Sequence, residues 1–335
     1  MIENLFRYAR IRGMNSVSQD PLDRLPLPCL VGPTAAGKTA LALSIAELTG
    51  CELISLDSMQ VYQGMDIGTA KATAEERARA PHHMLDLVQP SESFDVAMYL
   101  DEVRGLLSGL AEGGRRYLFI GGTAFWLRAL HFGLFDGPAR DEGVRARLAD
   151  LLEAEGAEAL HERLRSVDPA SAERLHPNDT RRVIRALEVF ELSGDPLSKQ
   201  QREWGWHESP RAQQRDVRVV GIVAEGESYE QRLRARVAAM LRAGWAEEAT
   251  SIRDGCGFGF TAAKALGYKE VLALADGELE AEACLDEITL RTRQFARKQR
   301  TWYRKLEGAH WVDALQEGSG YARVVEESAA KLGLL

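Results

Sequence analysis

Short apolar runs alternate with segments of helical periodicity through the first half of the chain. Four of the runs are typical of β-strands: LPCLV (27–31), ELISLDS (52–58), HHMLDLV (82–88) and RRYLFIGG (115–122). Between them, residues 40–48 and 96–110 place apolar side chains at the spacing of a helix face. This alternation predicts an α/β fold in which a parallel sheet is covered by helices on both faces.

The pattern changes after about residue 140. Residues 143–193 contain no strand-like run, and their apolar positions recur with a period near 3.6, so they predict an all-helical segment. One of its helices is expected to begin at Asn178 or Asp179 and to end at Gly194. After a polar loop over 198–216, the run RVVGIVA returns to strand, and the remainder is mostly helical.

These changes predict three parts. They are an N-terminal extension that we expect to be poorly ordered (1–26), an α/β core with C-terminal helices (27–140 and 215–335), and an all-helical insertion domain (141–214).

The composition of the 335 residues is that of a globular protein, with 45% apolar residues. No apolar run approaches the length of a membrane span, and the first 26 residues lack an apolar block long enough for a secretory signal. The four cysteines form no C-x-x-C pair, so we expect no zinc site. We therefore expect a cytoplasmic protein that has no membrane partner. We also expect it to be a monomer.

The net charge of −8 hides one strongly basic segment. Residues 289–305 contain seven basic residues and no acidic ones, and solvated helix faces usually mix both signs. A single helical stripe is predicted from the spacing of Arg293, Arg297, Arg300 and Arg304. A buried seam is expected from the seven-residue repeat of Ile288, Phe295 and Trp302. The stripe favours a nucleic-acid partner over a solvated surface.

The segment GPTAAGKT matches the phosphate-binding loop G-x-x-x-x-G-K-[ST] in full, after a strand and before a helix. It predicts a P-loop NTPase-like core. Backbone N–H groups and the helix N-terminus would hold a phosphate chain. The expected diphosphate-binding residues are Gly32, Pro33, Thr34, Ala35, Ala36, Gly37, Lys38 and Thr39. Among them, Lys38 supplies a charge for the phosphates, and Thr39 offers a hydroxyl to Mg²⁺.

Asp57 ends the second strand, where ligands of open parallel sheets bind. It is either a Walker B aspartate that holds Mg²⁺ through water, or a residue that caps a turn, or an acceptor-binding general base, which we favour. The fourth run ends in Gly121, Gly122 and Thr123, without the aspartate of a Walker B strand. Such a site suits the holding of a diphosphate better than the hydrolysis of a γ-phosphate.

The order of several motifs resembles the tRNA dimethylallyltransferase family, also called tRNA isopentenyltransferases or IPP transferases. These motifs are GPTAAGKT, DSMQVYQGMDIGTAK, APHHMLD, GGT, HPNDTRRVIRALEV, KALGYKE and TRQFARKQRTWYR. They cover most of the chain, from Gly32 to about Trp311. Ala36 departs from the serine of many members, and the zinc-finger tail of eukaryotic members is absent, which favours the bacterial type.

The resemblance implies that a dimethylallyl group moves from dimethylallyl diphosphate to N6 of the adenine 3′-adjacent to the anticodon in tRNA, releasing diphosphate. Lys38, Thr39 and Mg²⁺ would neutralise the leaving group. Asp57 would take the proton of the adenine amino group. Thr123 would contact the acceptor nucleotide or the bridging oxygen of the donor. The adenine must be flipped out of its stack, so contacts to the anticodon stem-loop must offset that cost.

The resemblance also implies a set of residues that contact tRNA. Besides Asp57 and Thr123, these are Ser58, Met59 and Gln60; Arg145, Arg181, Arg182, Val183, Ile184 and Arg185; Lys264, Ala265, Leu266, Gly267, Tyr268 and Lys269; and Arg297, Lys298, Gln299, Arg300, Thr301, Trp302, Tyr303 and Arg304. On this interpretation the insertion is a tRNA-binding domain. For Arg185, an i,i+3 pair with Glu188 is an alternative.

Three other functions are compatible with part of the sequence. A P-loop small-molecule kinase accounts for Lys38, Thr39 and Asp57, but not for the GGT strand end or the basic helix. An adenylate dimethylallyltransferase needs no tRNA-binding insertion. A non-enzymatic RNA-binding protein needs neither an intact phosphate loop nor Asp57.

Overall fold

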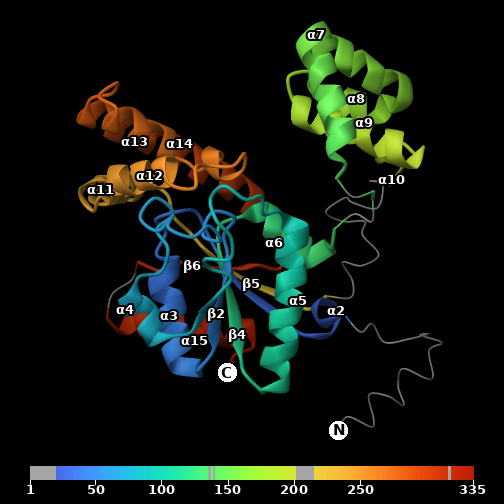
Figure 1. Ribbon diagram of the computed structural model, residues 1–335. Coiled ribbons are helices and arrows are strands. Elements are labelled where there is room, and N and C mark those ends of the chain that lie inside the picture. The colour runs from blue at the N-terminus through green and yellow to red at the C-terminus, as the bar shows by residue number, and fades with distance from the viewer. Residues whose placement is uncertain (1–19, 135–136, 139, 201–214, 316–317) are drawn as a thin grey trace, which may run out of the picture. The chain divides into compact units, whose positions relative to one another are not determined.

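The computed structural model describes residues 20–134, 137–138, 140–200, 215–315 and 318–335. Its sheet has six parallel strands in the order β3-β2-β4-β1-β5-β6 (Figure 1). Their bounds are β1 (Leu27–Val31), β2 (Glu52–Leu56), β3 (His82–His83), β4 (Tyr117–Gly121), β5 (Val217–Ile222) and β6 (His310–Val312). The predicted parallel α/β sheet is confirmed. The sequence did not predict β6, a strand of three residues at the edge of the sheet.

Helices cover both faces of this sheet. Helix α3 (Lys38–Thr49) and helix α15 (Ser319–Leu332) pack together on one face, and α5 (Val96–Glu112) lies on the other (Figure 1). The same unit contains three shorter helices, which are α2 (Pro21–Arg24), α4 (Ala74–Arg79) and α6 (Ala124–Phe132). Because the sheet is buried on both faces, every residue of β1 and of β2 is buried.

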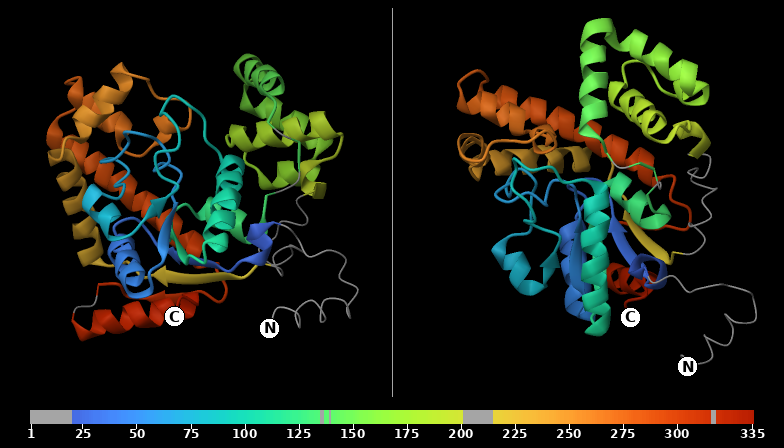
Figure 2. Two further views of the ribbon diagram at one scale, coloured as in Figure 1. Left: turned by 60° about the horizontal axis from the view of Figure 1, so that its bottom comes forward. Right: turned by 45° about the vertical axis from the view of Figure 1, so that its right-hand side comes forward.

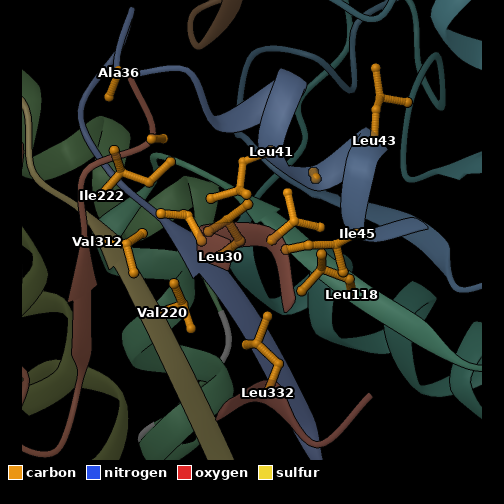
Figure 3. Packing of buried hydrophobic residues seen from close by; sticks show 14 of the residues in the cluster. Leu30, Ala36, Leu41, Leu43, Ile45, Leu118, Val220, Ile222, Val312 and Leu332 are labelled. Atoms are coloured by element: carbon orange, nitrogen blue, oxygen red, sulfur yellow. The ribbon is translucent and has the colours of Figure 1, made fainter. Parts of the chain in front are cut away.

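The core between the sheet and the α3–α15 layer is built from branched aliphatic side chains. Figure 3 shows Leu30 of β1 beside Ile45 of α3 and Val220 of β5, with Leu332 of α15 nearby. All four are at most 1% exposed. This packing fixes the strand that leads into the phosphate loop and the helix that follows it.

Four further helices form a layer beside the loops that follow the strands, as all views show (Figures 1 and 2). They are α11 (Glu227–Arg242), α12 (Trp245–Asp254), α13 (Tyr268–Ala275) and α14 (Ala281–Tyr303), with the 3₁₀ turn Ala262–Lys264 between α12 and α13. Helix α11 packs on α14, and α12 packs on α13.

The chain divides into two compact units. One comprises residues 1–131 and 215–335, and the other comprises residues 132–214. The second unit contains the helices α7 (Glu142–Val167), α8 (Pro169–Arg174), α9 (Thr180–Ser193) and α10 (Leu197–Gln200). Its own apolar core includes Leu160, Leu164, Val183 and Val189. Helix α9 begins after Asp179 and ends at Gly194, which is left-handed (φ 74°), as predicted.

Three local predictions differ from the structure or fall outside it. Residues 20–26 are not poorly ordered, because Asp20 caps α2 and Leu22 is fully buried. The run HHMLDLV forms only a two-residue strand, because the positive φ angles of Met84 (62°) and Asp86 (57°) bend the chain away from the sheet. The rest of the expected extension, 1–19, and most of the expected polar loop, 201–214, lie outside the described residues.

Candidate active site

A cavity of about 740 Å³ lies at the carboxyl ends of the strands, within the larger unit. Its wall contains the phosphate loop and the start of α3, the turn that follows β2 at Asp57, and the end of β4 at Gly122 and Thr123. Residues from α11 to α14 complete the wall. Because β4 lies between β1 and β2 in the sheet, the GGT segment is placed between the phosphate loop and Asp57.

The phosphate loop has the backbone that its sequence predicts. Gly37 is left-handed (φ 91°) and precedes Lys38, the first residue of α3, and no acidic residue occupies the first turn of that helix. The Nζ of Lys38 donates to the carbonyl oxygens of Gly32 (3.0 Å) and Pro33 (2.8 Å). Burial lowers the pKa of Lys38 to about 8; the charge of Arg236 acts in the same direction, and Asp57 opposes it. The loop therefore presents a half-buried cation and a helix N-terminus, both of which attract an anion.

Asp57 follows β2 directly and faces the same cavity. Its Oδ1 accepts the N–H of Met59 (2.9 Å), so the turn-capping alternative is present together with a cavity position. Burial raises the pKa of Asp57, although hydrogen bonds from Met59 and Gln60 and the charge of Lys38 oppose that change. A half-buried carboxylate with a raised pKa beside a phosphate loop is suited to accept a proton.

The two glycines of the GGT segment are required by packing within the protein. A Cβ on Gly121 would lie 2.1 Å from the carbonyl oxygen of Leu56, and one on Gly122 would lie 2.5 Å from Nε2 of Gln299. The close neighbours at both positions are protein atoms, so packing within the protein accounts for these glycines. Thr123 follows them, and its Oγ1 accepts the N–H of Ser58 (3.1 Å), so the hydroxyl lies beside the Asp57 turn.

Gln299 of α14 holds the phosphate loop to the end of β4. Its Oε1 accepts the N–H of Thr34 (3.1 Å), and its Nε2 donates to the carbonyl oxygen of Gly122 (2.8 Å). The side chain is 5% exposed. Both ends of its amide are therefore used to position the site, and because Gln299 also lines the cavity, its contact with tRNA stays a prediction.

Arg236 of α11 was not identified from the sequence. It lines the cavity, and its charge acts on the pKa values of both Lys38 and Asp57. The sequence did contain a signal, because Arg236 lies between Leu233 and Val237 on the buried side of an amphipathic helix. An arginine at such a position is unusual unless it has a partner or a ligand.

Most of the residues predicted in the KALGYK segment (264–269) and in the turn after Asp57 line the cavity, and Tyr268 does not. Ser58, Met59, Gln60 and five of the six segment residues line the cavity: Lys264, Ala265, Leu266, Gly267 and Lys269. Tyr268 is 1% exposed, and its hydroxyl donates to Glu248 (2.7 Å). The side chain of Tyr268 is thus used within the protein, and its contact with a nucleic acid stays a prediction.

The basic stripe of α14 is partly occupied by contacts within the larger unit. Arg293 pairs with Glu230 (3.0 Å), and Arg304 pairs with Glu225 (3.6 Å). Arg300 donates to the carbonyl oxygen of Ala224 (3.0 Å). Arg297 and Lys298 are exposed, and within the described part of the chain neither forms an ion pair. Thr301 is also exposed, whereas Tyr303 is 1% exposed, and the contact of either residue with tRNA stays a prediction.

The predicted seam of α14 is also wrong in part. Ile288 is buried, but Phe295 is 44% exposed and Trp302 is half-buried. A straight helix drifts by about 20° per seven residues, so a strict seven-residue repeat leaves the buried face. The residues that are buried are Cys284, Ile288, Ala296, Gln299 and Tyr303. Phe295 lies at the edge of this face and lines the cavity.

In the second unit, buried Glu188 binds two of the expected tRNA-contacting arginines. Arg145 donates to both carboxylate oxygens (2.8 and 2.9 Å), and Arg185 donates to Oε2 (2.7 Å). The alternative assignment of Arg185 to a pair with Glu188 is thus present. Val183 is buried in the apolar core of this unit, and its contact with tRNA stays a prediction. Arg181 and Arg182 are exposed at the start of α9, and Ile184 is half-buried.

No described helix is long and apolar enough to cross a membrane. Likewise, the described residues contain no group of three or more histidine, cysteine, aspartate or glutamate side chains that could hold a metal ion.

Comparison with known proteins gives consistent matches over most of the chain. A family model described as IPP transferase matches residues 60–306, and one described as isopentenyl transferase matches residues 26–86. A tRNA dimethylallyltransferase of Geobacillus kaustophilus is 40% identical over 307 residues, which cover 91% of this chain and 96% of the relative. One from Symbiobacterium thermophilum is 43% identical over 291 residues, which cover 87% and 90%.

Solved structures agree with these matches. The full-length tRNA isopentenylpyrophosphate transferase of Bacillus halodurans aligns with a TM-score of 0.65 at 35% identity, over 92% of this chain and 97% of that one. A eukaryotic dimethylallyltransferase, described as acting on tRNA, aligns with a TM-score of 0.74 at 25% identity, over 91% and 78%. The chain therefore belongs to the IPP transferase family, and it is a transferase.

Proposed function

We propose that the protein transfers a dimethylallyl group from dimethylallyl diphosphate to N6 of the adenine 3′-adjacent to the anticodon in tRNA, and releases diphosphate. The observation that carries this proposal is one cavity that combines the phosphate-loop residues 34–39, the half-buried cations Lys38 and Arg236, and the carboxylate of Asp57. Support for a tRNA acceptor comes from the relative described as acting on tRNA.

The diphosphate would bind at the phosphate loop. The backbone N–H groups and the N-terminus of α3 favour its negative charge, and Lys38 would exchange the carbonyl oxygens of Gly32 and Pro33 for phosphate oxygens. Arg236 would contact the same group from α11. These donors stabilise the charge that develops on the leaving diphosphate.

Magnesium fits this site through Thr39. The Thr39 side chain lines the cavity in the first turn of α3. Mg²⁺ keeps several waters and is commonly held by one or two protein oxygens together with substrate phosphates, so a single hydroxyl beside a diphosphate is sufficient. When bound, the ion would neutralise charge on the leaving group.

Asp57 would act on the acceptor. The N6 lone pair attacks the allylic carbon while the bond from that carbon to the diphosphate oxygen breaks, and the carboxylate of Asp57 accepts the N6 proton. Thr123 would orient the acceptor nucleotide or the bridging oxygen of the donor from the adjacent strand end. Apolar side chains of α11 that line the cavity, Leu233 and Val237 on either side of Arg236, would enclose the dimethylallyl group.

Contacts to the rest of the tRNA would come from the exposed cations of both units. In the larger unit these are Arg297 and Lys298 of α14, and in the smaller one Arg181 and Arg182 of α9.

An acceptor assay tests the proposal. The full-length protein is incubated with labelled dimethylallyl diphosphate and Mg²⁺, with unmodified tRNA or AMP as the acceptor. We expect label in tRNA, none in AMP, and no requirement for ATP. Label in AMP alone would identify an adenylate dimethylallyltransferase. No label in either acceptor, together with phosphoryl transfer from ATP, would indicate a kinase.

A further inference from the structure

We propose that Glu248 is a positioning residue that fixes the acceptor side of the cavity, by holding the loop 65–71 through its backbone. The proposal rests on the function proposed above and assigns a role to a side chain that does not itself line the cavity.

Glu248 lies on α12, far from this loop in sequence, and its carboxylate gathers four donors. Oε2 accepts the N–H groups of Asp66 (2.9 Å) and Ile67 (2.7 Å). Oε1 accepts the N–H of Gly68 (3.1 Å) and the hydroxyl of Tyr268 (2.7 Å). Three consecutive N–H groups thus converge on one carboxylate, in the manner of an anion-binding nest.

The loop 65–71 packs closely against α12 and α13, and this packing fixes the position of the Glu248 carboxylate. A Cβ on Gly68 would lie 2.2 Å from Nε1 of Trp245, and one on Gly267 would lie 2.1 Å from Cη2 of the same ring. Tyr268 meets Trp245 edge to face, with ring centroids 5.7 Å apart. The KALGYK segment is thereby explained in part as the support of Glu248.

Lys71 anchors the other end of the loop. Its side chain is 1% exposed, and Nζ binds the carboxylates of Asp66 and Asp86, each at 2.6 Å, as well as the carbonyl oxygen of Tyr62 (2.7 Å). With Glu248 at one end and Lys71 at the other, the residues between them, Thr69 and Ala70, are held on both sides.

Thr69 and Ala70 link the position of this loop to a side chain in the cavity. The Nε2 of Gln60 donates to the carbonyl oxygens of Thr69 and Ala70, each at 3.3 Å, and its Oε1 accepts the hydroxyl of Ser55 (2.8 Å). Gln60 lines the cavity together with Asp57 and with Gly68, Thr69 and Ala70. A displaced loop would therefore move the amide of Gln60, which stands three residues after the proposed base.

The test uses Glu248→Gln in the full-length protein, with Glu247→Gln as the matched control. Glutamine keeps the size of the side chain but brings an NH₂ group toward donors, so some N–H groups of the nest lose their acceptor. Glu247 is exposed and lies on the same helix. Transfer to an anticodon stem-loop RNA, binding of Mg²⁺–pyrophosphate, and amide exchange of the loop 65–71 are measured for each.

We expect Glu248→Gln to lower kcat/KM for RNA on the order of 10²-fold, as a displacement of about 1 Å at a reacting group does. Amide exchange should increase at Asp66, Ile67 and Gly68, while Mg²⁺–pyrophosphate affinity stays unchanged. Tyr268→Phe, which removes one donor to the same carboxylate, should cause a smaller loss in the same parameter. Glu247→Gln should change none of these values.

Two results would overturn the proposal. In one, Glu248→Gln weakens pyrophosphate binding as much as it slows transfer, which means a general loss of the fold. In the other, amide exchange in the loop increases but transfer to RNA is unchanged. If the wild type itself transfers no label to RNA, the proposed function fails, and unaltered exchange in Glu248→Gln would separately refute the positioning role.

Discussion

At the residue scale, the pH dependence of kcat/KM tests the protonation state of Asp57. A general base acts only when it is ionised, and burial raises the pKa of this carboxyl. We therefore expect kcat/KM to fall on the acid side with a midpoint above the usual aspartate value of about 3.9. Asp57→Asn should lower kcat by about 10²-fold or more and remove that acid limb. Pyrophosphate binding serves as the control, and near-wild-type turnover of the variant would exclude the assignment.

Arg236 supplies a second test at this scale. If it contacts the diphosphate, Arg236→Gln should weaken Mg²⁺–pyrophosphate binding by roughly 10- to 100-fold, the range for a hydrogen bond to a charged group. Arg234→Gln on the same helix is the control, because Arg234 pairs with Glu282 and Asp286 outside this cavity. Isothermal titration measures both affinities. Equal effects of the two substitutions would show that only the overall charge of α11 matters.

At the scale of elements, the sequence predicted the features that depend only on residues close together in the chain. The phosphate loop and the Asp179 and Gly194 boundaries of α9 depend on neighbouring residues, and they were identified from the sequence. The positioning roles of Gln299 and Glu248 could not be predicted, because each side chain forms hydrogen bonds to segments about 180 or more residues away. Nothing in a linear pattern distinguishes such a side chain from an ordinary polar residue of a helix.

The structure also changes the choice of residues in α14 for a test of tRNA binding. Arg300 holds the carbonyl of Ala224, so its replacement would disturb the fold. Arg297→Gln with Lys298→Gln removes two exposed cations instead. The log–log salt dependence of tRNA affinity should become shallower by roughly one to two units, because each neutralised phosphate releases counterions.

The matched control for this experiment is Arg293→Gln, which removes a cation already paired with Glu230. Affinity for tRNA is measured across a salt titration for each variant. A double variant with the slope of the wild type would mean that α14 does not contact the phosphates, and that the smaller unit provides the charged contacts.

At the scale of the molecule, the sequence predicted the class of fold better than the extent of its parts. Strands of a parallel sheet are mostly apolar, so β1, β2, β4 and β5 were visible as runs. The edge strand β6 has three residues and no such run. Residues 20–26 were assigned to the extension because their order depends on long-range contacts, such as the pair between Asp20 and Arg104 (3.0 Å). The basic clusters were visible in the sequence, but their spacing did not reveal which arginines form ion pairs within the protein.

The smaller unit contains the buried carboxyl of Glu188, which leads to a prediction about the stability of this unit at acid pH. Burial alone raises the pKa of Glu188, but the hydrogen bonds from Arg145, Arg185 and the N–H of Asp141 outweigh it and lower the pKa from 4.5 to about 2. A carboxyl whose pKa is lower in the folded state stabilises that state above its unfolded pKa. This stabilisation is on the order of 3 kcal/mol at neutral pH, and it is lost as the pH falls from about 4.5 toward 2.

Glu188→Gln should therefore destabilise the smaller unit at pH 7 and have progressively less effect below pH 4.5, because the wild-type carboxyl then becomes protonated as well. Hydrogen exchange with peptide resolution reads α7 and α9 separately from the larger unit, where protection and pyrophosphate binding should be unchanged. Glu191→Gln is the control, since its pair with Arg147 is largely exposed and is worth about 0.2–1 kcal/mol. A destabilisation by Glu188→Gln that is the same at pH 7 and pH 3 would show that the side chain acts by packing and that its charge is not used.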